Sequence, residues 1–266
     1  GIPECWFKGN APGSGRFRLM KTMSKYWKIK ACDEVLAGKL FQALEDIPKP
    51  LAALLAQRGC KTADEAREFM NPALSALRDP FELPDMDKAV QRIRRALADG
   101  EQITVFGDYD ADGVCSTALM VRVLREMGGN ISTYIPSRHE SGYGLSPEAL
   151  TACVEKNNPS LIVTVDCGTS SIEAVLAARL EGIDVVVTDH HEPGGLVADA
   201  VAIVNPKQVD NHPSSILAGV GVAFKVCHAL VKAGRDEDCA VCAAVDLKNV
   251  LDFVAVATVT DMVPLV

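Results

Sequence analysis

Short β-branched runs alternate with helical stretches after Gly100, and this alternation constrains the fold more than any other feature of the chain. The apolar runs lie at 103–107, 131–135, 161–165, 185–188 and 201–205, and the helical stretches lie at about 114–127, 147–156, 170–181, 215–233 and 247–257. Strands that alternate with helices of about 10–15 residues form βαβ units, whose strands run parallel. We therefore predict an α/β fold with a doubly wound, mostly parallel sheet.

The chain is predicted to have three parts, of which the α/β region at 100–266 is the last. Residues 23–99 carry a helical pattern and form a predicted helical N-terminal subdomain. Residues 1–22 are rich in Gly and Pro and lack an apolar period, so we expect a flexible appendage there.

Three helices are predicted within the N-terminal subdomain. An apolar face recurs over 35–44 and stops ahead of Pro48. Thr62 and Glu65 have the spacing of a capping box, which predicts a helix that begins just after Thr62. The stretch 86–98 predicts the third helix.

Charge is unevenly distributed along the chain, and this bears on its partners. Residues 1–30 carry seven Lys and Arg against one Glu, a balance of +6, so a net charge of −8 for the chain leaves −14 on the remainder. Such an acidic body disfavours generic binding of nucleic acid, which depends on Lys and Arg contacts to phosphate. It is compatible with an acidic cleft that holds metal cations, because bound cations reverse the local field.

Nine cysteines are scattered over the chain, and no apolar stretch of signal-peptide length precedes them. We interpret most of them as reduced thiols that pack in the interior. Cys239 and Cys242 have CxxC spacing, and a structural zinc or redox role stays open for this pair. No apolar run approaches the ~18 residues of a membrane helix, so we expect a soluble, cytoplasmic protein without a membrane partner.

Acidic and imidazole side chains directly follow three of the predicted strands. The first strand leads into GDYDADG at 107–113, the third into VDCG at 165–168, and the fourth into TDHH at 188–191. Parallel sheets place functional groups at the carboxyl ends of their strands. A single Asp after a strand is commonly a helix cap or a turn former, but three such strand ends together indicate a site.

The residue types at these strand ends are those that bind divalent metal ions. An EF-hand is excluded, because position twelve counted from Asp108 is Leu119 instead of Glu and the run follows a strand. Carboxylates mixed with imidazoles favour Mn²⁺ over Mg²⁺ or Zn²⁺. Such a set can hold two ions about 3.5–4 Å apart and activate a water for attack on a phosphoryl centre.

Four motifs occur in an order and spacing that resemble those of the DHH phosphoesterase superfamily. They are GDYDADG (107–113), VDCG (165–168), TDHH (188–191) and TVTDMVPL (258–265). The likeness extends to RHESGYGLSP (138–147), VNPKQ (204–208), LAGVGVAFK (217–225) and LAALLAQRG (51–59), and it covers residues 27–266 in all. Within the superfamily, the chain is most similar to the exonucleases that degrade single-stranded DNA from 5′ to 3′.

The resemblance implies a set of metal ligands. Asp110 and Asp112 would each bind one of two Mn²⁺ ions, and Asp166 would bridge them. His190 and Asp261 would complete the second site. Mg²⁺ is the alternative ion.

Further roles follow from the resemblance and from position in the chain. His191 would lie against the scissile phosphate, and Asp189 would orient the histidine pair. Some relatives have a His where this chain has Phe106, so Asp108 is an additional candidate ligand. Three residues after the second predicted strand are candidates for contact with DNA phosphate or a stacked base: Arg138, His139 and Tyr143.

The function implied by the resemblance is two-metal-ion hydrolysis of phosphodiester bonds in single-stranded DNA, in DNA repair and recombination. Single-strand-binding protein and a helicase are the partners expected from the family. Relatives continue into a DHH-associated domain and an OB-fold, which we expect to be absent from these 266 residues. The alternatives are a DHH phosphodiesterase of oligonucleotides or cyclic dinucleotides and a non-catalytic DHH module of a replication complex.

Overall fold

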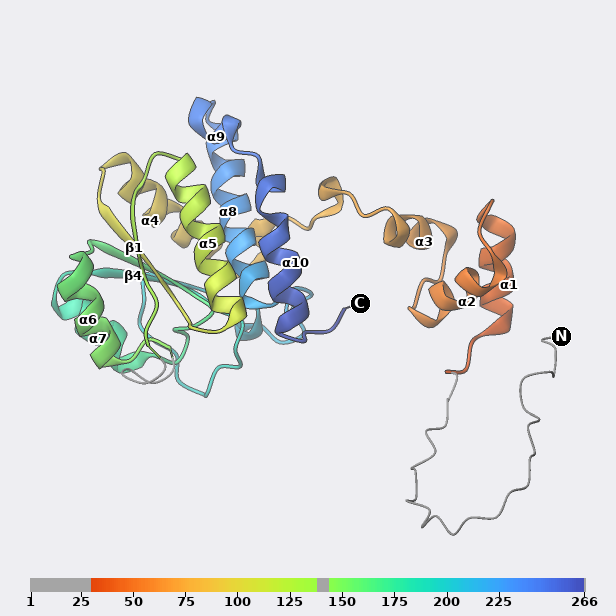
Figure 1. The fold of residues 1–266 in the computed structure, drawn as a ribbon, viewed down its shortest axis with the longest axis horizontal. Helices are drawn as coiled ribbons and strands as arrows, with labels where there is room; N and C mark the ends of the chain where they lie inside the picture. Colours follow the sequence, from red (N-terminus) through yellow and green to blue (C-terminus); the bar gives the residue numbers. More distant parts are fainter. Residues whose placement is uncertain (1–29, 138–143, 266) are drawn as a thin grey trace, which may run out of the picture. The chain divides into compact units, whose positions relative to one another are not determined.

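The structure is a computed structural model that describes residues 30–137 and 144–265. The chain divides into two compact units, Gly1–Leu74 and Ser75–Val266, and each has a hydrophobic core of its own (Figure 1). The parallel sheet belongs entirely to the second unit.

The described part of the first unit contains the helices α1 (Glu34–Ala43), α2 (Lys49–Gln57) and α3 (Ala63–Met70). Asp33 caps α1, because its Oδ1 accepts hydrogen bonds from the backbone nitrogens of Val35 at 3.0 Å and Leu36 at 2.9 Å. These helices enclose a small apolar core formed by Leu40, Leu44, Ala52, Leu55, Cys60 and Ala66.

The helices α2 and α3 begin in different ways. Pro48 is the N-cap of α2 and Pro50 lies in its first turn, where a missing N–H costs no helical hydrogen bond. Pro48, which follows the first predicted helical pattern, therefore also begins α2, a helix that we did not predict. Thr62 Oγ1 accepts from the backbone nitrogen of Glu65 at 3.2 Å, as the predicted capping box requires.

Five strands form the sheet of the second unit. They are β1 (Gln102–Gly107), β2 (Asn130–Tyr134), β3 (Leu161–Val165), β4 (Asp184–Thr188) and β5 (Ala202–Val204). Their order is β2-β1-β3-β4-β5, and every neighbouring pair is parallel. The order reverses between β1 and β3, which makes their carboxyl ends a topological switch point, where open α/β sheets bind ligands.

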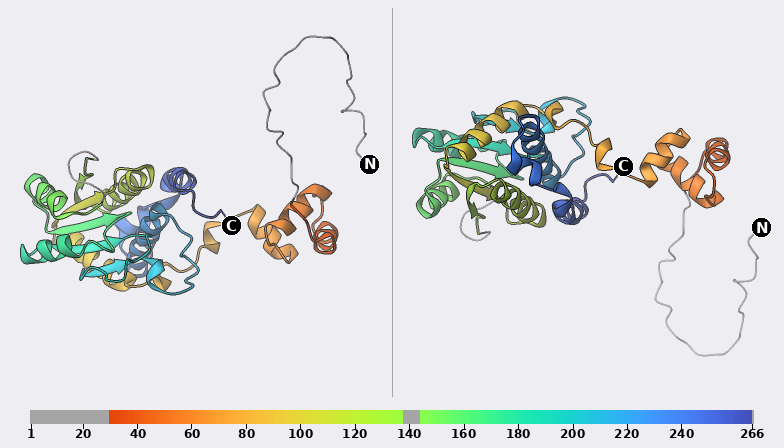
Figure 2. Two further views of the ribbon diagram at one scale, coloured as in Figure 1. Left: turned by 90° about the horizontal axis from the view of Figure 1, so that it is seen from below. Right: turned by 90° about the horizontal axis from the view of Figure 1, so that it is seen from above.

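Helices cover both faces of the sheet, which confirms the predicted doubly wound α/β fold (Figures 1 and 2). One layer contains α4 (Met86–Ala98), α5 (Ala111–Glu126), α8 (Gly219–Asp236) and α10 (Leu251–Thr260), with the short α9 (Ala240–Ala244) beside α8. The other layer contains α6 (Pro147–Asn157) and α7 (Ile172–Leu180). Short 3-10 helices lie at Leu74–Ala76, Pro80–Glu82, Pro206–Gln208 and Leu247–Val250.

The helix α4 packs with the sheet, although we predicted it as part of an N-terminal subdomain ending at residue 99. Its buried residues, among them Ile93, belong to the same core as β1 and β3. Arg92 strengthens this attachment, because its guanidinium contacts Glu101 at 2.6 Å and Asp184 at 2.5 Å. The boundary between the two compact units accordingly lies between residues 74 and 75 of the sequence, and the α/β unit includes α4.

Among the described residues, none of the helices combines the length and the apolar character that a membrane crossing requires.

Candidate metal centre

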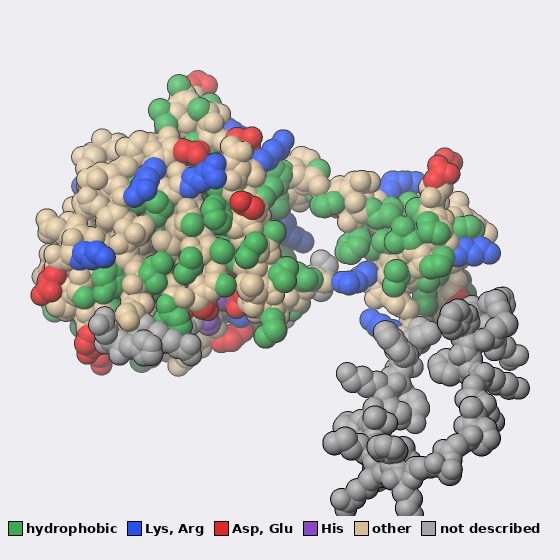
Figure 3. Space-filling view, viewed as in Figure 1, with side chains coloured by type: hydrophobic (Ala, Val, Ile, Leu, Met, Phe, Trp, Pro, Cys, Tyr) green, Lys and Arg blue, Asp and Glu red, His purple; other side chains and the backbone are tan. Residues whose placement is uncertain are grey.

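Carboxylates and imidazoles meet at the carboxyl ends of the central strands. Asp108, Asp110 and Asp112 follow β1, Asp166 follows β3, and Asp189, His190 and His191 follow β4. Asp261 is the residue that ends α10. The predicted metal ligands therefore come from four separate segments and are brought to the switch point of the sheet. On the surface of the larger unit, histidine and acidic side chains lie next to one another (Figure 3).

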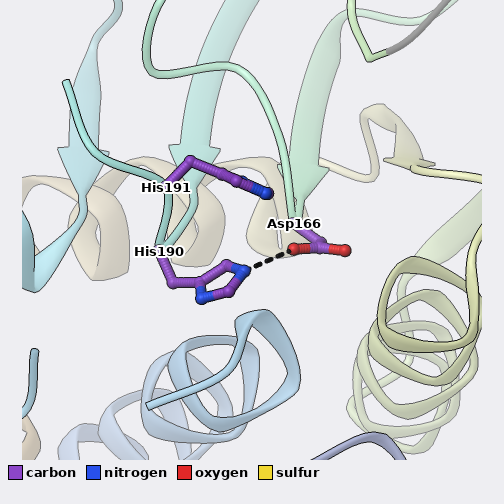
Figure 4. Close-up of side chains that lie close together, drawn as sticks. All are labelled: Asp166, His190 and His191. Carbon is purple, nitrogen blue, oxygen red and sulfur yellow. Dashed lines mark ion pairs between the residues drawn. The ribbon is translucent and has the colours of Figure 1, made fainter. Parts of the chain in front are cut away.

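His190 lies among three carboxylates. Its Nε2 atom is 3.1 Å from Oδ1 of Asp166, 3.8 Å from Oδ2 of Asp112 and 3.8 Å from Oδ2 of Asp261. The His190 ring projects from the loop after β4 toward Asp166, and the His191 ring lies beside it (Figure 4). One imidazole thus connects acidic side chains from three different parts of the chain.

A second acidic group lies at the end of β1. Single carboxylate oxygens of Asp108, Asp110 and Asp166 all lie within 4.8 Å of one another. Asp112, His190 and Asp261 form another group with the same spacing. Asp166 joins the two groups, since it belongs to the first and contacts His190 of the second.

Gly113 allows the acidic loop after β1 to fold tightly. A Cβ atom at this position would lie 2.4 Å from the backbone oxygen of Asp108, which is closer than side chains tolerate. The backbone nitrogen of Gly113 donates to Oδ1 of Asp110 at 2.9 Å, so Asp110 is the N-cap of α5. The cap places the start of α5 at Ala111, three residues ahead of the predicted start.

The start of α8 holds Asp112 in place. Oδ2 of Asp112 accepts from the backbone nitrogen of Gly219 at 2.6 Å, and Oδ1 accepts from that of Val220 at 2.8 Å. These donors are among the backbone N–H groups that have no partner within the helix, and they favour an anion. The GVG run at 219–221 therefore contacts the acidic centre through its backbone nitrogens.

Asp189 forms hydrogen bonds with both histidines of the pair. Its Oδ1 accepts from the backbone nitrogen of His190 at 2.7 Å and lies 2.8 Å from Nδ1 of His191, and its Oδ2 accepts from the backbone nitrogen of Thr169 at 2.9 Å. Burial alone would raise the pKa of Asp189, but these hydrogen bonds outweigh it and lower the pKa to about 2. The bond to Asp189 in turn raises the pKa of His191.

Asp166 occupies the most strained position of the centre. Its φ of 62° lies in the left-handed region, which is uncommon for residues other than Gly and is found at functional sites. Burial, followed by the charges of Asp112 and Asp110, raises the pKa of Asp166 to about 9. Burial also raises the pKa of Asp112, although the N–H groups of α8 oppose that effect.

Asn205 is a further supporting residue that sequence reasoning did not assign. Its Nδ2 donates to Oγ1 of Thr169 at 2.9 Å and to the backbone oxygen of His191 at 2.9 Å. It is fully buried and ties the loop after β3 to the loop after β4. Its place directly after β5, at a strand end like the acidic motifs, was the available signal.

Three predicted substrate contacts, Arg138, His139 and Tyr143, lie outside the described residues. They stay predictions.

The chemistry of the centre fits divalent cations. Oδ1 of Asp166 and both ring nitrogens of His190 are buried and have no hydrogen-bond partner among the described residues. Their only described polar contacts are the ion pairs of His190 Nε2 with Asp166, Asp112 and Asp261. Several carboxylates are held close together, and burial together with their mutual repulsion raises the pKa of Asp166. Cations placed between them would remove the repulsion and satisfy the buried atoms.

The fold and this set of side chains define a class of protein. Residues 102–258 match the DHH family, N-terminal domain, and the chain belongs to this family.

Named relatives are single-stranded-DNA-specific exonucleases called RecJ. The chain is 40% identical to that of Bacillus subtilis over 90% of its own length and 29% of the relative. It is 44% identical to that of Escherichia coli over 83% of its own length and 38% of the relative. The crystal structure of RecJ from Thermus thermophilus in complex with Mn²⁺ superposes with a TM-score of 0.69 at 28% identity, over 87% of this chain and 31% of that one. The chain thus spans about a third of the length of these relatives.

Proposed function

We propose that this chain carries the hydrolytic centre of a 5′→3′ exonuclease that acts on phosphodiester bonds of single-stranded DNA. The observation that carries the proposal is the position of Asp166 between two ligand groups, one with Asp108 and Asp110 and one reached through His190. A carboxylate shared by two ligand groups can hold two cations close together, and two-metal hydrolysis of phosphodiesters uses cations about 3.5–4 Å apart. The names of the relatives add the substrate, and DNA repair and recombination are the proposed context.

Two Mn²⁺ ions are the cofactor that we propose. Asp108 and Asp110 would hold one ion, and Asp166 would contact both ions. A second group of ligands would hold the other ion. The second group consists of Asp112, His190 and Asp261. An imidazole among carboxylates favours Mn²⁺ over Mg²⁺. Structures of the Thermus relative are named as complexes with Mn²⁺ and with Mg²⁺, so Mg²⁺ is the alternative ion. When bound, such ions lower the pKa of a coordinated water and stabilise charge on phosphoryl oxygens.

His191 is the residue that we propose for contact with the scissile phosphate. The bond from Nδ1 to Asp189 fixes the ring and raises its pKa, which favours the charged form of the imidazole. A charged imidazole whose remaining N–H faces the centre can donate a hydrogen bond to a phosphate oxygen. Asp189 and Asn205 would keep this ring in position during the reaction.

The partners and compartment are proposed on general grounds. Single-stranded DNA is the proposed substrate, and single-strand-binding protein and a helicase are the proposed protein partners. The cytoplasm is the proposed compartment, since all eight described cysteines are free thiols, as is usual in a reducing environment.

The test measures nucleotide release from labelled single-stranded DNA in the presence of Mn²⁺. We expect the chain to release nucleotides from the 5′ end, with duplex DNA, short RNA and pyrophosphate as poorer substrates. Asp166→Asn should abolish the release, because one neutral amide cannot serve two cations. Asp199→Asn is a matched control, since that exposed carboxylate pairs only with Arg179 among the described residues.

Two outcomes would contradict the proposal. Faster cleavage of short RNA or pyrophosphate than of single-stranded DNA would favour another phosphodiesterase of the family. Release that Asp166→Asn leaves unchanged would place the chemistry outside this centre.

A further inference from the structure

Two thiols lie together at the start of α9, at the opposite end of α8 from Asp112. The helix α8 begins with Gly219 in the acidic centre and runs for 18 residues, which corresponds to about 27 Å, before the chain reaches Cys239. Cys239 is the residue before α9, and Cys242 lies in the first turn (Figure 1). The pair is therefore separate from the proposed metal site.

The side chain of Cys239 contacts the backbone of Cys242. Sγ of Cys239 accepts a hydrogen bond from the backbone nitrogen of Cys242 at 3.5 Å. The position that a Cβ atom would take at Gly234 lies 2.5 Å from Cβ of Cys242 and 3.7 Å from Cβ of Cys239. Both cysteine Cβ atoms thus lie beside the same residue of α8, so the two side chains are neighbours, as a disulfide between them requires.

Gly234 is what allows α8 to close over the pair. A Cβ atom at this position would lie 2.2 Å from Sγ of Cys242, so any larger residue would collide with the thiol. Cys242 is consequently buried with 5% exposure, whereas Cys239 is partly exposed. Small molecules can therefore reach the thiol of Cys239, whereas the thiol of Cys242 is shielded from solvent.

The electrostatic surroundings differ between the two thiols. The hydrogen bond with Cys242 lowers the pKa of Cys239, and the Arg94 guanidinium also favours its thiolate. Burial raises the pKa of Cys242 to about 11. Arg94 is held nearby by Glu237, whose Oε1 lies 2.7 Å from Nη1 of the guanidinium. The accessible sulfur is the better nucleophile of the two.

We propose that Cys239 and Cys242 form a reversible dithiol–disulfide site that is oxidised by low-molecular-weight disulfides such as oxidised glutathione. The Cys239 thiolate attacks one sulfur of the disulfide, which forms a mixed disulfide and releases one thiolate of the reagent. Cys242 then loses its proton to solvent, and its sulfur attacks Sγ of Cys239. The second reagent thiolate leaves, so the protein loses two electrons and two protons and the reagent becomes two thiols.

Other described thiols lack this arrangement. Cys153 and Cys227 are fully buried, and burial raises the pKa of Cys153 to about 12. Cys115 is partly exposed, but burial and the charge of Asp112 raise its pKa. A zinc site at the pair is disfavoured, because in the described part of the chain no group of possible metal ligands includes Cys239 or Cys242.

The experiment equilibrates the chain in glutathione buffers, quenches with acid, alkylates and maps the cysteines by mass spectrometry. We expect a 239–242 disulfide at a ratio of oxidised to reduced glutathione roughly tenfold lower than the ratio that modifies any other cysteine. Cys242→Ser should accumulate glutathione on Cys239, and Cys239→Ser should leave Cys242 unmodified. Cys115→Ser is the matched control and should behave like the unaltered chain.

A second measurement requires no substitution. In the reduced native chain, iodoacetamide should alkylate Cys239 roughly tenfold faster than Cys242 or Cys115. Equal rates for the three, or modification of Cys115 by glutathione at ratios where no 239–242 disulfide has formed, would overturn the proposal.

Discussion

Oδ2 of Asp112 lies 2.6 Å from the backbone nitrogen of Gly219, a residue 107 positions further along the chain. This bond joins the acidic loop after β1 to the start of α8. Gly219 also lies next to the carboxylate of Asp166. A Cβ atom at Gly219 would lie 2.5 Å from Oδ1 of Asp166. One glycine therefore sets the spacing between two of the proposed metal ligands.

Replacing Gly219 should disturb the centre more than the fold. We expect Gly219→Ala to weaken Mn²⁺ binding at least about tenfold, because Asp166 must move away from the added methyl group. Isothermal titration calorimetry measures the affinity. Gly221→Ala is the control from the same helical turn, since its added Cβ would meet the Leu217 side chain at 3.2 Å and no ligand. Equal loss of affinity in both variants would contradict this account.

Mn²⁺ should stabilise the α/β unit by mass action. A ligand that binds only the folded state at 100 times its dissociation constant adds about 2.7 kcal/mol to the free energy of unfolding. We expect thermal melting to shift upward in Mn²⁺ and the shift to vanish in Asp166→Asn. The Asp199→Asn control should retain it, and an unchanged melting temperature in millimolar Mn²⁺ would argue against metal binding.

The metal-free protein should lose stability as the pH rises. The pKa of Asp166 is about 9 in the folded state, and an unfolded Asp has a pKa of about 3.9. Between these values the folded state holds a proton that the unfolded state has released, so the free energy of unfolding falls as the pH increases. We expect the melting temperature of the unaltered chain to decrease from about pH 5 to about pH 8, and that of Asp166→Asn to decrease less.

Mn²⁺ should reverse this pH dependence. The ion competes with the proton on Asp166, so its affinity should increase with pH until the carboxyl is fully ionised. Calorimetry in buffers of different ionisation enthalpy measures the protons released per ion. Binding without proton release at neutral pH would contradict the raised pKa.

Replacing His190 and replacing His191 should impair different properties of the chain. His190 contacts three carboxylates of the centre, so His190→Ala should weaken Mn²⁺ binding, by about 10–100-fold. His191 is held by Asp189, so His191→Ala should leave metal affinity nearly intact and lower turnover on single-stranded DNA. Comparable metal loss in both variants, measured by calorimetry, would refute the division of roles.

The chain by itself should degrade single-stranded DNA slowly. It spans about a third of its relatives, and the positioning of reactants contributes up to about 7–11 kcal/mol in well-oriented systems. We expect nucleotide release at least about 100-fold slower than that of a full-length RecJ relative at equal Mn²⁺. Comparable rates would show that residues 1–266 contain the substrate-binding determinants, and 138–143 would be the first residues to mutate.

Local pattern alone was enough to predict the parallel sheet and the helices between its strands. The alternation of β-branched runs with helical stretches dictates parallel strands, because only a crossover helix returns the chain to the same edge of a sheet. The acidic strand ends at Asp110, Asp166 and His190 then had to lie on one side, since parallel strands end together. Helix limits were less predictable: α5 begins three residues early because Asp110 is its cap.

Only the tertiary structure decided which groups meet at that edge. The position of both motifs after parallel strands predicts that Asp112 lies near His190. It does not predict the backbone donors at Gly219 and Val220, because hydrogen bonds between distant segments leave no period in the sequence. The same reason applies to Asn205 and to the attachment of α4 by Arg92. Apolar periodicity tells which face of a helix is buried, whereas the partner of that face depends on how the whole chain packs.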